Sequence, residues 1–137
     1  MILGLGTDLI DSRRIEKALS RFGQVFIRRV FTDKEISFCE GRKNNKKVLA
    51  YALRFSAKEA CSKALGTGMN GIGWRDIEIV SSPSGKPDIV LGGRAAEVLK
   101  TLTPEGCTPQ INVSLSDEPP YGTATVIISA NEVIHGR

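Results

Sequence analysis

The first half of the chain combines one strand-like segment with several segments of helical spacing. Residues 2–10 alternate with the two-residue period of a strand. One face carries Gly4, Gly6 and Asp8, and the other carries Leu3, Leu5, Thr7 and Leu9. Asp11 or Ser12 then caps a helix with the apolar stripe Ile15, Ala18, Leu19 and Phe22. A capping-box pattern at 32–35 predicts a second, short helix that contains Ile36 and Cys39.

The most regular helical pattern covers residues 48–65 and follows a basic segment, 41–47, that we expect to be a loop. One side of this helix is apolar and mostly small: Leu49, Ala52, Leu53, Ala57, Ala60, Cys61, Ala64 and Leu65. Because small side chains allow a close approach, we expect the helix to pack tightly against a sheet or another helix. Gly66 and Gly68 end it.

The second half of the chain is rich in strand patterns. Its predicted strands are residues 77–80, 88–91, 111–116 and 123–129, and a short helix is predicted over 94–100. The first two strands flank a turn at 81–87 and form a hairpin; the last two pair across 117–122, with Ile111, Val113 and Leu115 facing the core. Early helices and late antiparallel strands indicate the α+β class, with an antiparallel sheet packed on the long helix.

The last predicted strand has apolar residues on both faces. Ala124, Val126 and Ile128 lie on one side, and Ile127 lies on the other. A small sheet that leaves one face to water carries polar residues there. The second face is therefore expected to be covered, by a helix of the same chain or by a neighbouring protomer. Since the long helix covers only one face, we expect an oligomer.

Composition places the chain among ordered globular proteins. Its 137 residues suit one domain over 1–137, and 41% hydrophobic with 25% charged residues exclude wholesale disorder. No apolar run approaches the ~20 residues that span a bilayer. The three cysteines lack metal or disulfide spacing. We therefore expect a soluble, cytoplasmic protein that binds no membrane.

The net charge of the chain and its single histidine limit the partners and the catalytic groups that we expect. Nineteen basic residues against 15 acidic ones give a net charge of +4, which favours an anionic partner: a nucleic acid, a phosphorylated cofactor or an acidic protein. The excess also fits a charge that serves solubility alone. His135 is the only histidine, so the chain has almost no residues for a histidine-based nucleophile pair or metal site. An enzyme built on this chain would depend on carboxylates, lysines and a hard metal ion.

Two carboxylates are candidates for that chemistry. Asp8 lies on the glycine face of the first strand, where we expect Gly4 and Gly6 to leave space for a bulky group; the alternative is a strand-end residue that caps the next helix. Glu59 and Lys63 are four residues apart and share a face of the long helix. They form either an exposed ion pair or a ligand site, in which Glu59 holds a divalent cation and Lys63 contacts a phosphate.

Basic residues gather in two places. Arg14, Lys17 and Arg21 form a stripe on the first predicted helix, which is either a solvated face or a docking surface for an acidic partner. The segment 41–47 carries Arg42, Lys43, Lys46 and Lys47, which suit a terminal phosphate or belong to an ordinary exposed loop. Aromatic residues make up only 6%, with no stacking pair on a predicted strand face, so we expect no nucleic-acid partner.

Four short motifs occur together in this chain. They are Gly4-x-Gly6-x-Asp8, Arg54-Phe55-x-x-Lys58-Glu59-Ala60-x-x-Lys63-Ala64, Gly85-Lys86-Pro87 and Val113-Ser114-Leu115-Ser116. Each motif is weak alone. In this order and in a chain of this length, they resemble the holo-[acyl-carrier-protein] synthase family, the small single-domain branch of the 4′-phosphopantetheinyl transferases. The resemblance runs from the first strand to about Ile128.

The resemblance implies the 4′-phosphopantetheinyl transferase-like fold and a reaction. Family members transfer the 4′-phosphopantetheine arm of coenzyme A to a serine of apo acyl carrier protein and release adenosine 3′,5′-bisphosphate. It implies that Asp8 and Glu59 hold Mg²⁺ against the coenzyme A pyrophosphate and that Lys63 contacts the pyrophosphate, so these three are the expected catalytic residues. The expected coenzyme A contacts also include Arg54, Lys46, Lys47, Gly85, Lys86 and Pro87, the last three near the adenosine end.

The resemblance also implies partners and an assembly. The helix with Arg14, Lys17 and Arg21 would dock the acidic carrier protein, and the family is typically a homotrimer with each active site between two protomers. Members often have a histidine directly after the Ser-x-Ser strand, where this chain has Asp117, so that histidine's role is in doubt here. The proton acceptor for the serine is then Glu59 or a metal-bound water or hydroxide, slightly in favour of the water because a cation lowers a carboxylate pKa. Two alternative functions stay open: a basic nucleic-acid-binding module, which the low aromatic content disfavours, and a non-catalytic coenzyme A or nucleotide sensor of the same fold.

Overall fold

A computed structural model describes residues 1–133, so His135 lies outside the described residues. The strands are β1 (Ile2–Asp11), β2 (Ile77–Ser81), β3 (Pro87–Leu91), β4 (Cys107–Glu118) and β5 (Tyr121–Glu132). The helices are α1 (Ser12–Phe22), α2 (Gln24–Val30), α3 (Asp33–Glu40), α4 (Asn45–Leu65), the 3₁₀ turn η1 (Trp74–Asp76) and α5 (Gly93–Leu102). The α+β prediction is confirmed, and the described residues contain no helix long and apolar enough to cross a membrane.

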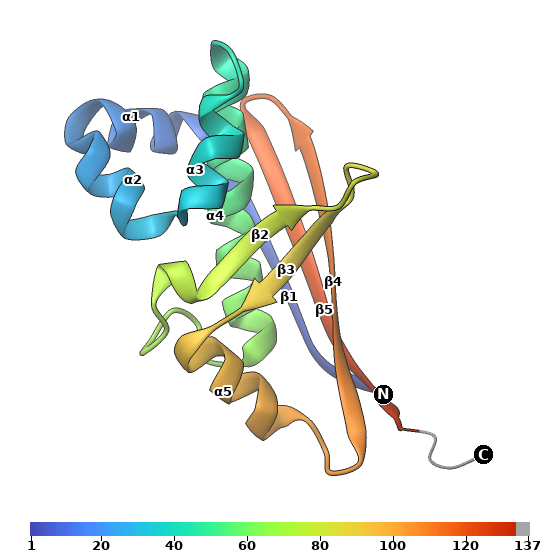
Figure 1. Cartoon of the computed structure of the whole chain (residues 1–137). Helices are drawn as coiled ribbons and strands as arrows, with labels where there is room; N and C mark the ends of the chain where they lie inside the picture. Colours follow the sequence, from blue (N-terminus) through green and yellow to red (C-terminus); the bar gives the residue numbers. More distant parts are fainter. Residues whose placement is uncertain (134–137) are drawn as a thin grey trace.

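The long helix α4 lies between two antiparallel sheets. One sheet has the order β1-β5-β4, and the other is the predicted hairpin of β2 and β3. Pairing places Leu5 opposite Ile127 and Val113 opposite Val126. Figure 1 shows the three-stranded sheet on one side of α4 and the hairpin on the other, with α1–α3 near the start of α4 and α5 near its end.

Strand β1 crosses α4 at very close range. A Cβ atom on Gly6 would lie 1.8 Å from the carbonyl oxygen of Ala60, and one on Gly4 would lie 1.9 Å from that of Ala64. The prediction that these glycines leave open space for a ligand was therefore wrong, because the α4 backbone fills that space. The prediction that α4 packs closely on its neighbour is confirmed, and small residues on both elements are the reason.

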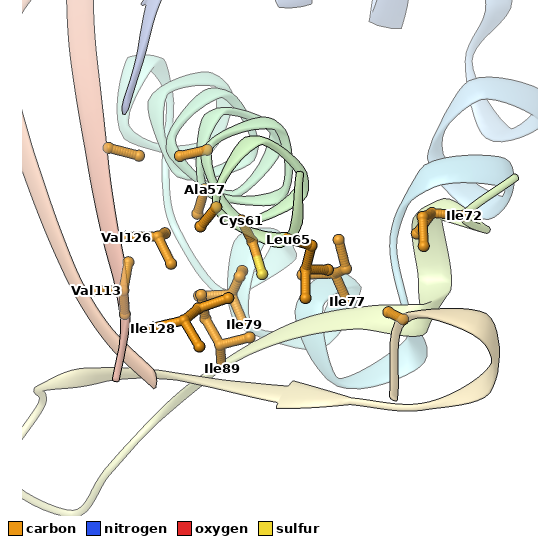
Figure 2. Packing of buried hydrophobic residues seen from close by; sticks show 14 of the residues in the cluster. Ala57, Cys61, Leu65, Ile72, Ile77, Ile79, Ile89, Val113, Val126 and Ile128 are labelled. Carbon is orange, nitrogen blue, oxygen red and sulfur yellow. The ribbon is translucent and has the colours of Figure 1, made fainter. Parts of the chain in front are cut away.

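The main core joins α4 to both sheets. In Figure 2, Cys61 and Leu65 of α4 face the isoleucines of the hairpin, with Val126 and Ile128 of β5 close by. Val113 of β4 is buried with them, as its predicted inward face requires. A second cluster, around Tyr51 and Phe31, packs α1–α3 against the first half of α4.

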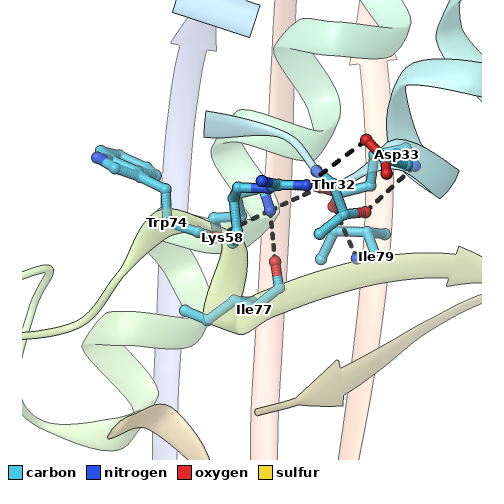
Figure 3. Close-up of polar contacts among 8 residues, drawn as sticks. Thr32, Asp33, Lys58, Trp74, Ile77 and Ile79 are labelled. Atoms are coloured by element: carbon cyan, nitrogen blue, oxygen red, sulfur yellow. Dashed lines mark hydrogen bonds and ion pairs between the residues drawn. The ribbon is translucent and has the colours of Figure 1, made fainter. Parts of the chain in front are cut away.

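A buried ion pair connects α3, α4 and the hairpin. Lys58 and Glu35 are fully buried, with 2.8 Å between Nζ and Oε1. The Lys58 ammonium also donates to the carbonyls of Trp74 and Ile77, and Glu35 accepts from the backbone N–H groups of Thr32 and Ile79 (Figure 3). This network fixes the hairpin relative to the residues of α4 that follow Lys58.

Several element predictions need correction. Helix α2 was not predicted, because it is only seven residues long and Gly23 before it provides no side-chain cap. Helix α4 begins at Asn45, so the predicted basic loop at 41–47 is shorter than expected. Phe22 is 53% exposed although it continues the apolar stripe of α1, since that helix ends there and the chain turns away at Gly23.

Candidate active site

Asp8 and Lys63 meet where β1 crosses α4. The Asp8 carboxylate accepts a hydrogen bond of 2.7 Å from the hydroxyl of Ser56 and lies 3.5 Å from the Lys63 ammonium. Lys63 also donates to the carbonyl of Thr7 at 2.9 Å. Asp11, not Asp8, caps α1 by accepting from the backbone N–H of Arg13. The helix-cap alternative for Asp8 was therefore wrong, which leaves its carboxylate available for a ligand.

Glu59 faces the same place from α4. Burial, and then the charge of Asp8, raise the pKa of Glu59 above its ordinary value, while Lys63 and Arg14 partly offset that rise. Two carboxylates that repel each other at a half-buried position fit a divalent cation, because the cation would remove the repulsion. Among residues 1–133, no group of three or more His, Cys, Asp or Glu side chains could hold a metal ion. A cation held by this pair would therefore take further oxygen ligands from phosphate and water, as Mg²⁺ commonly does.

A cavity of about 440 Å³ lies on another side of α4. Its lining includes Arg54 and the predicted turn Gly85, Lys86 and Pro87, together with Phe38 and residues of β4. Arg54 is only 5% exposed, and its burial lowers the pKa of the guanidinium. The structure therefore brings together Arg54 and the Gly85–Pro87 turn, which are far apart in the sequence.

This cavity and the two carboxylates face different directions within one chain. Arg54 and Glu59 are five residues apart on α4, which is a rotation of about 140° around the helix axis. A ligand that touches both places on one protomer would have to bend around the helix. Two protomers could instead present the two places to one ligand.

Lys46 and Lys47 do not reach either place. Both lie in the first turn of α4, and Lys46 is roughly 25 Å from Lys63 along the helix axis. The ammonium of Lys47 is 3.1 Å from Glu40, which also accepts from the Tyr51 hydroxyl at 2.6 Å. Lys46 lines a separate cavity of about 590 Å³ near Asp117.

The predicted docking residues lie on the exposed side of α1. Arg14, Lys17 and Arg21 are all exposed. Two apolar neighbours were missed: Phe22 is 53% exposed and lies 5.2 Å below the Arg21 guanidinium, and Val25 is 74% exposed. The sequence signal for Val25 was its position two residues after Gly23, the glycine at which the first helix ends. The surface of α1 and α2 thus combines cations with exposed apolar groups.

Comparison with known proteins identifies the family. The model of the 4′-phosphopantetheinyl transferase superfamily matches residues 4–115. A holo-[acyl-carrier-protein] synthase of Nitrobacter hamburgensis is 51% identical over 133 residues, with 95% of this chain and 96% of the relative covered. One from Beijerinckia indica is 54% identical over 131 residues, with 95% and 92% covered.

Solved structures agree with the sequence relatives. The crystal structure of holo-[acyl-carrier-protein] synthase from Neisseria meningitidis has a TM-score of 0.82 and 34% identity, and covers 94% of this chain and 99% of its own. The Helicobacter pylori enzyme in complex with coenzyme A has a TM-score of 0.76 and 30% identity, with 91% and 99% covered. This chain therefore belongs to the 4′-phosphopantetheinyl transferase superfamily and, within it, to the holo-[acyl-carrier-protein] synthase family.

Proposed function

We propose that this chain transfers the 4′-phosphopantetheine arm of coenzyme A to a serine of apo acyl carrier protein and releases adenosine 3′,5′-bisphosphate. The observation that carries the proposal is the meeting of Asp8, Glu59 and Lys63 at the β1–α4 crossing. Relatives named holo-[acyl-carrier-protein] synthase, one of them in complex with coenzyme A, support it.

Asp8 and Glu59 are proposed to hold Mg²⁺. A bound Mg²⁺ supplies charge neutralisation and polarises the pyrophosphate. Ser56 orients the Asp8 carboxylate through the 2.7 Å hydrogen bond. Lys63, half exposed, is free to turn toward an incoming pyrophosphate, where its charge would stabilise the leaving group.

The adenosine end of coenzyme A is proposed to bind in the cavity lined by Arg54, Phe38 and the Gly85–Pro87 turn, called the Arg54 cavity below. Its volume of about 440 Å³ is in the range of small-molecule sites, and Arg54 and Lys86 supply two cations. Lys46 and Lys47 remain proposed coenzyme A contacts only if bound coenzyme A extends from this cavity toward the start of α4. The pyrophosphate does not need these two lysines, because its proposed contacts are the cation held by Asp8 and Glu59, and Lys63.

A homotrimer is proposed as the active unit, with each site between two protomers. The face of the three-stranded sheet that points away from α4 exposes Leu5, Leu9 and Ile127, at 63%, 67% and 36%. Leu5 and Ile127 lie directly opposite each other across β1 and β5. No helix of residues 1–133 covers these side chains, which supports burial by a neighbour.

The carrier protein is proposed to dock on α1 through Arg14, Lys17 and Arg21. The exposed Phe22 and Val25 would add apolar contact to this basic surface. The cytoplasmic location is part of the same proposal, because both substrates are expected there. The buried thiols Cys39 and Cys61 and the free Cys107 agree with a reducing compartment.

Mass spectrometry of apo acyl carrier protein tests the function. The protein is incubated with coenzyme A, Mg²⁺ and this chain, and a gain of one phosphopantetheine arm on its serine is the expected result. An apo carrier protein whose acceptor serine is replaced by alanine is the control and should gain nothing. Binding of coenzyme A without any mass gain would contradict the proposal and favour a sensor.

A further inference from the structure

The Arg54 guanidinium is a buried cation with an unused hydrogen-bond donor. The residue is 5% exposed, and its Nε has no hydrogen-bond partner within residues 1–133. Leaving a buried polar group unpaired costs folding free energy, so such groups are rare without a ligand or a compensating neighbour.

The neighbour that compensates is an aromatic ring. The Cζ atom of Arg54 lies 3.7 Å from the ring centroid of Phe38 in α3, and the Cζ of Arg42 lies 4.4 Å from the same centroid. Both guanidinium groups therefore lie within contact distance of the Phe38 ring. The ring quadrupole, negative on the faces, attracts both cations.

This contact suits a guanidinium that must also bind a ligand. A carboxylate partner would occupy the N–H donors of Arg54 and cancel its charge. A ring face attracts the cation but leaves the donors in the guanidinium plane free. Phe38 and Arg54 both line the 440 Å³ cavity, and Lys86 reaches it from the hairpin turn. The cavity therefore presents two cations and free planar donors, an arrangement that fits a phosphate.

We propose that Phe38 is a positioning residue, which holds the Arg54 guanidinium at the cavity wall so that it binds the ribose 3′-phosphate of coenzyme A. The inference rests on the proposed function, in which Asp8, Glu59 and Lys63 take the pyrophosphate. The phosphate left for the Arg54 cavity is then the one on the 3′ position of the ribose.

Substrates with and without that phosphate test the role of Phe38. With coenzyme A, the Phe38→Leu variant should raise KM about 3- to 30-fold and keep kcat, as expected for the loss of one desolvated cation–π contact. With dephospho-coenzyme A, which lacks the 3′-phosphate, the same variant should match the wild type. An equal loss with both substrates would show a general structural defect and would overturn the inference.

Two further variants complete the test. Phe38→Tyr keeps the ring and should restore the wild-type KM for coenzyme A; a Tyr variant as impaired as Phe38→Leu would overturn the inference. Phe55→Leu removes another ring of the same cluster, one that stacks on Trp74 at 4.8 Å, and should leave the preference for coenzyme A over dephospho-coenzyme A unchanged. Loss of that preference in Phe55→Leu would show that the effect is not specific to the ring at position 38 and would overturn the inference.

Ligand binding separates this inference from the proposed function. If the wild type transfers nothing to apo carrier protein, the proposed function fails. Calorimetry with adenosine 3′,5′-bisphosphate and adenosine 5′-monophosphate then still tests the Phe38 contact. Phe38→Leu should weaken binding of the bisphosphate alone, and equal affinity of wild type and variant for the bisphosphate would overturn the inference.

Discussion

Gly6 positions a carboxylate two residues away. Because it has no side chain, β1 approaches α4 until the backbones touch, and Asp8 on the same face of the strand arrives beside Ser56 and Lys63. An alanine at position 6 would bring its Cβ within 1.8 Å of the Ala60 carbonyl oxygen and would force the two elements apart. The spacing Gly-x-Asp is thus a geometric requirement of this site.

Removing either carboxylate charge should abolish most of the proposed Mg²⁺-dependent transfer. Asp8→Asn and Glu59→Gln keep the shape of the side chains but lose the charge that attracts a cation, so activity should fall at least about 100-fold at limiting Mg²⁺. The measurement is the initial rate against Mg²⁺ concentration. Near-normal activity in one variant would show that its residue is not a ligand.

Glu59→Gln has a second expected effect that separates it from a folding defect. It removes a carboxylate that is partly buried and repelled by Asp8. The variant without metal should therefore unfold at the same temperature as the wild type or a higher one at pH 7. A lower midpoint would mean that Glu59 makes stabilising contacts that its charge repulsion does not outweigh.

The cysteines predict a selective thiol reactivity. Burial raises the pKa of Cys39 and of Cys61 from 9.0 to about 12, so both remain protonated and shielded in the folded chain. Cys107 is partly exposed. A thiol reagent at pH 8 should modify Cys107 alone, and the other two only after denaturation. Rapid modification of all three thiols in the folded state would contradict this.

The same shifts predict a loss of stability at high pH. An unfolded thiol ionises near pH 9 but a folded one only near pH 12, so rising pH in this window favours the unfolded state. The denaturant midpoint should therefore decline between pH 9 and pH 11. The Cys61→Ala variant should be less stable at pH 7 but should decline less steeply, and an unchanged slope would assign the effect to other groups.

At the scale of elements, the Lys58–Glu35 pair joins two parts of the site. It fixes α4, which carries Arg54, Glu59 and Lys63, to β2, which leads into the Gly85–Pro87 turn. Lys58→Met would leave the Glu35 carboxylate buried without its cation and should lower the free energy of unfolding by about 3–5 kcal/mol. Denaturant titration measures this change.

A double-mutant cycle provides the control for this pair. Glu35→Gln combined with Lys58→Met should cost less than the sum of the two single changes, because neither variant side chain then carries an unpaired charge. Strict additivity would mean that the pair contributes no coupling. Lys34→Met, an exposed lysine next to Glu35 in α3, should have little effect.

Elements with a long regular pattern could be predicted from the sequence, and short ones could not. The end of α4 at Leu65 and the pairing of β4 with β5 followed from the sequence pattern, whereas the first turn of α4 was predicted as a loop. Helix α2, seven residues without a side-chain cap, gave no comparable signal. In the site, the sequence showed that β1 has a glycine face, but the prediction that a ligand occupies the space above it was wrong. The backbone of Ala60 and Ala64 fills that space, and no local sequence pattern shows this. Likewise, the contact of Phe38 with Arg54 depends on how α3 packs on α4.

At the scale of the whole molecule, the basic surface of α1 predicts a salt-sensitive encounter with the carrier protein. Arg14 is close enough to influence Glu59, so Arg21 is the cleaner probe. Arg21→Glu should raise KM for the carrier protein several-fold, most strongly at low salt, and leave KM for coenzyme A unchanged. Arg94→Glu, a charge reversal at another exposed arginine, on α5, is the control. Equal effects of Arg21→Glu on both substrates would contradict docking.

The proposed trimer makes two predictions about assembly. Because the exposed Leu5, Leu9 and Ile127 would be buried by a neighbour, light scattering should give about three times 14.8 kDa. Because the Asp8–Glu59 pair and the Arg54–Lys86 cavity face different directions, they should act on one coenzyme A from different protomers. A mixture of inactive variants can then rebuild intact sites.

Complementation tests that division directly. Asp8→Asn protomers keep an intact Lys86, and Lys86→Glu protomers keep an intact Asp8. In randomly mixed trimers, one site in about four would combine the two wild-type halves, so about a quarter of the wild-type activity should return. Mixing Asp8→Asn with Glu59→Gln, which damage the same half, should restore nothing. A monomer that is fully active at the assay concentration would contradict both the trimer and the shared site, since each protomer would then have to bring one coenzyme A around α4 to both places by itself.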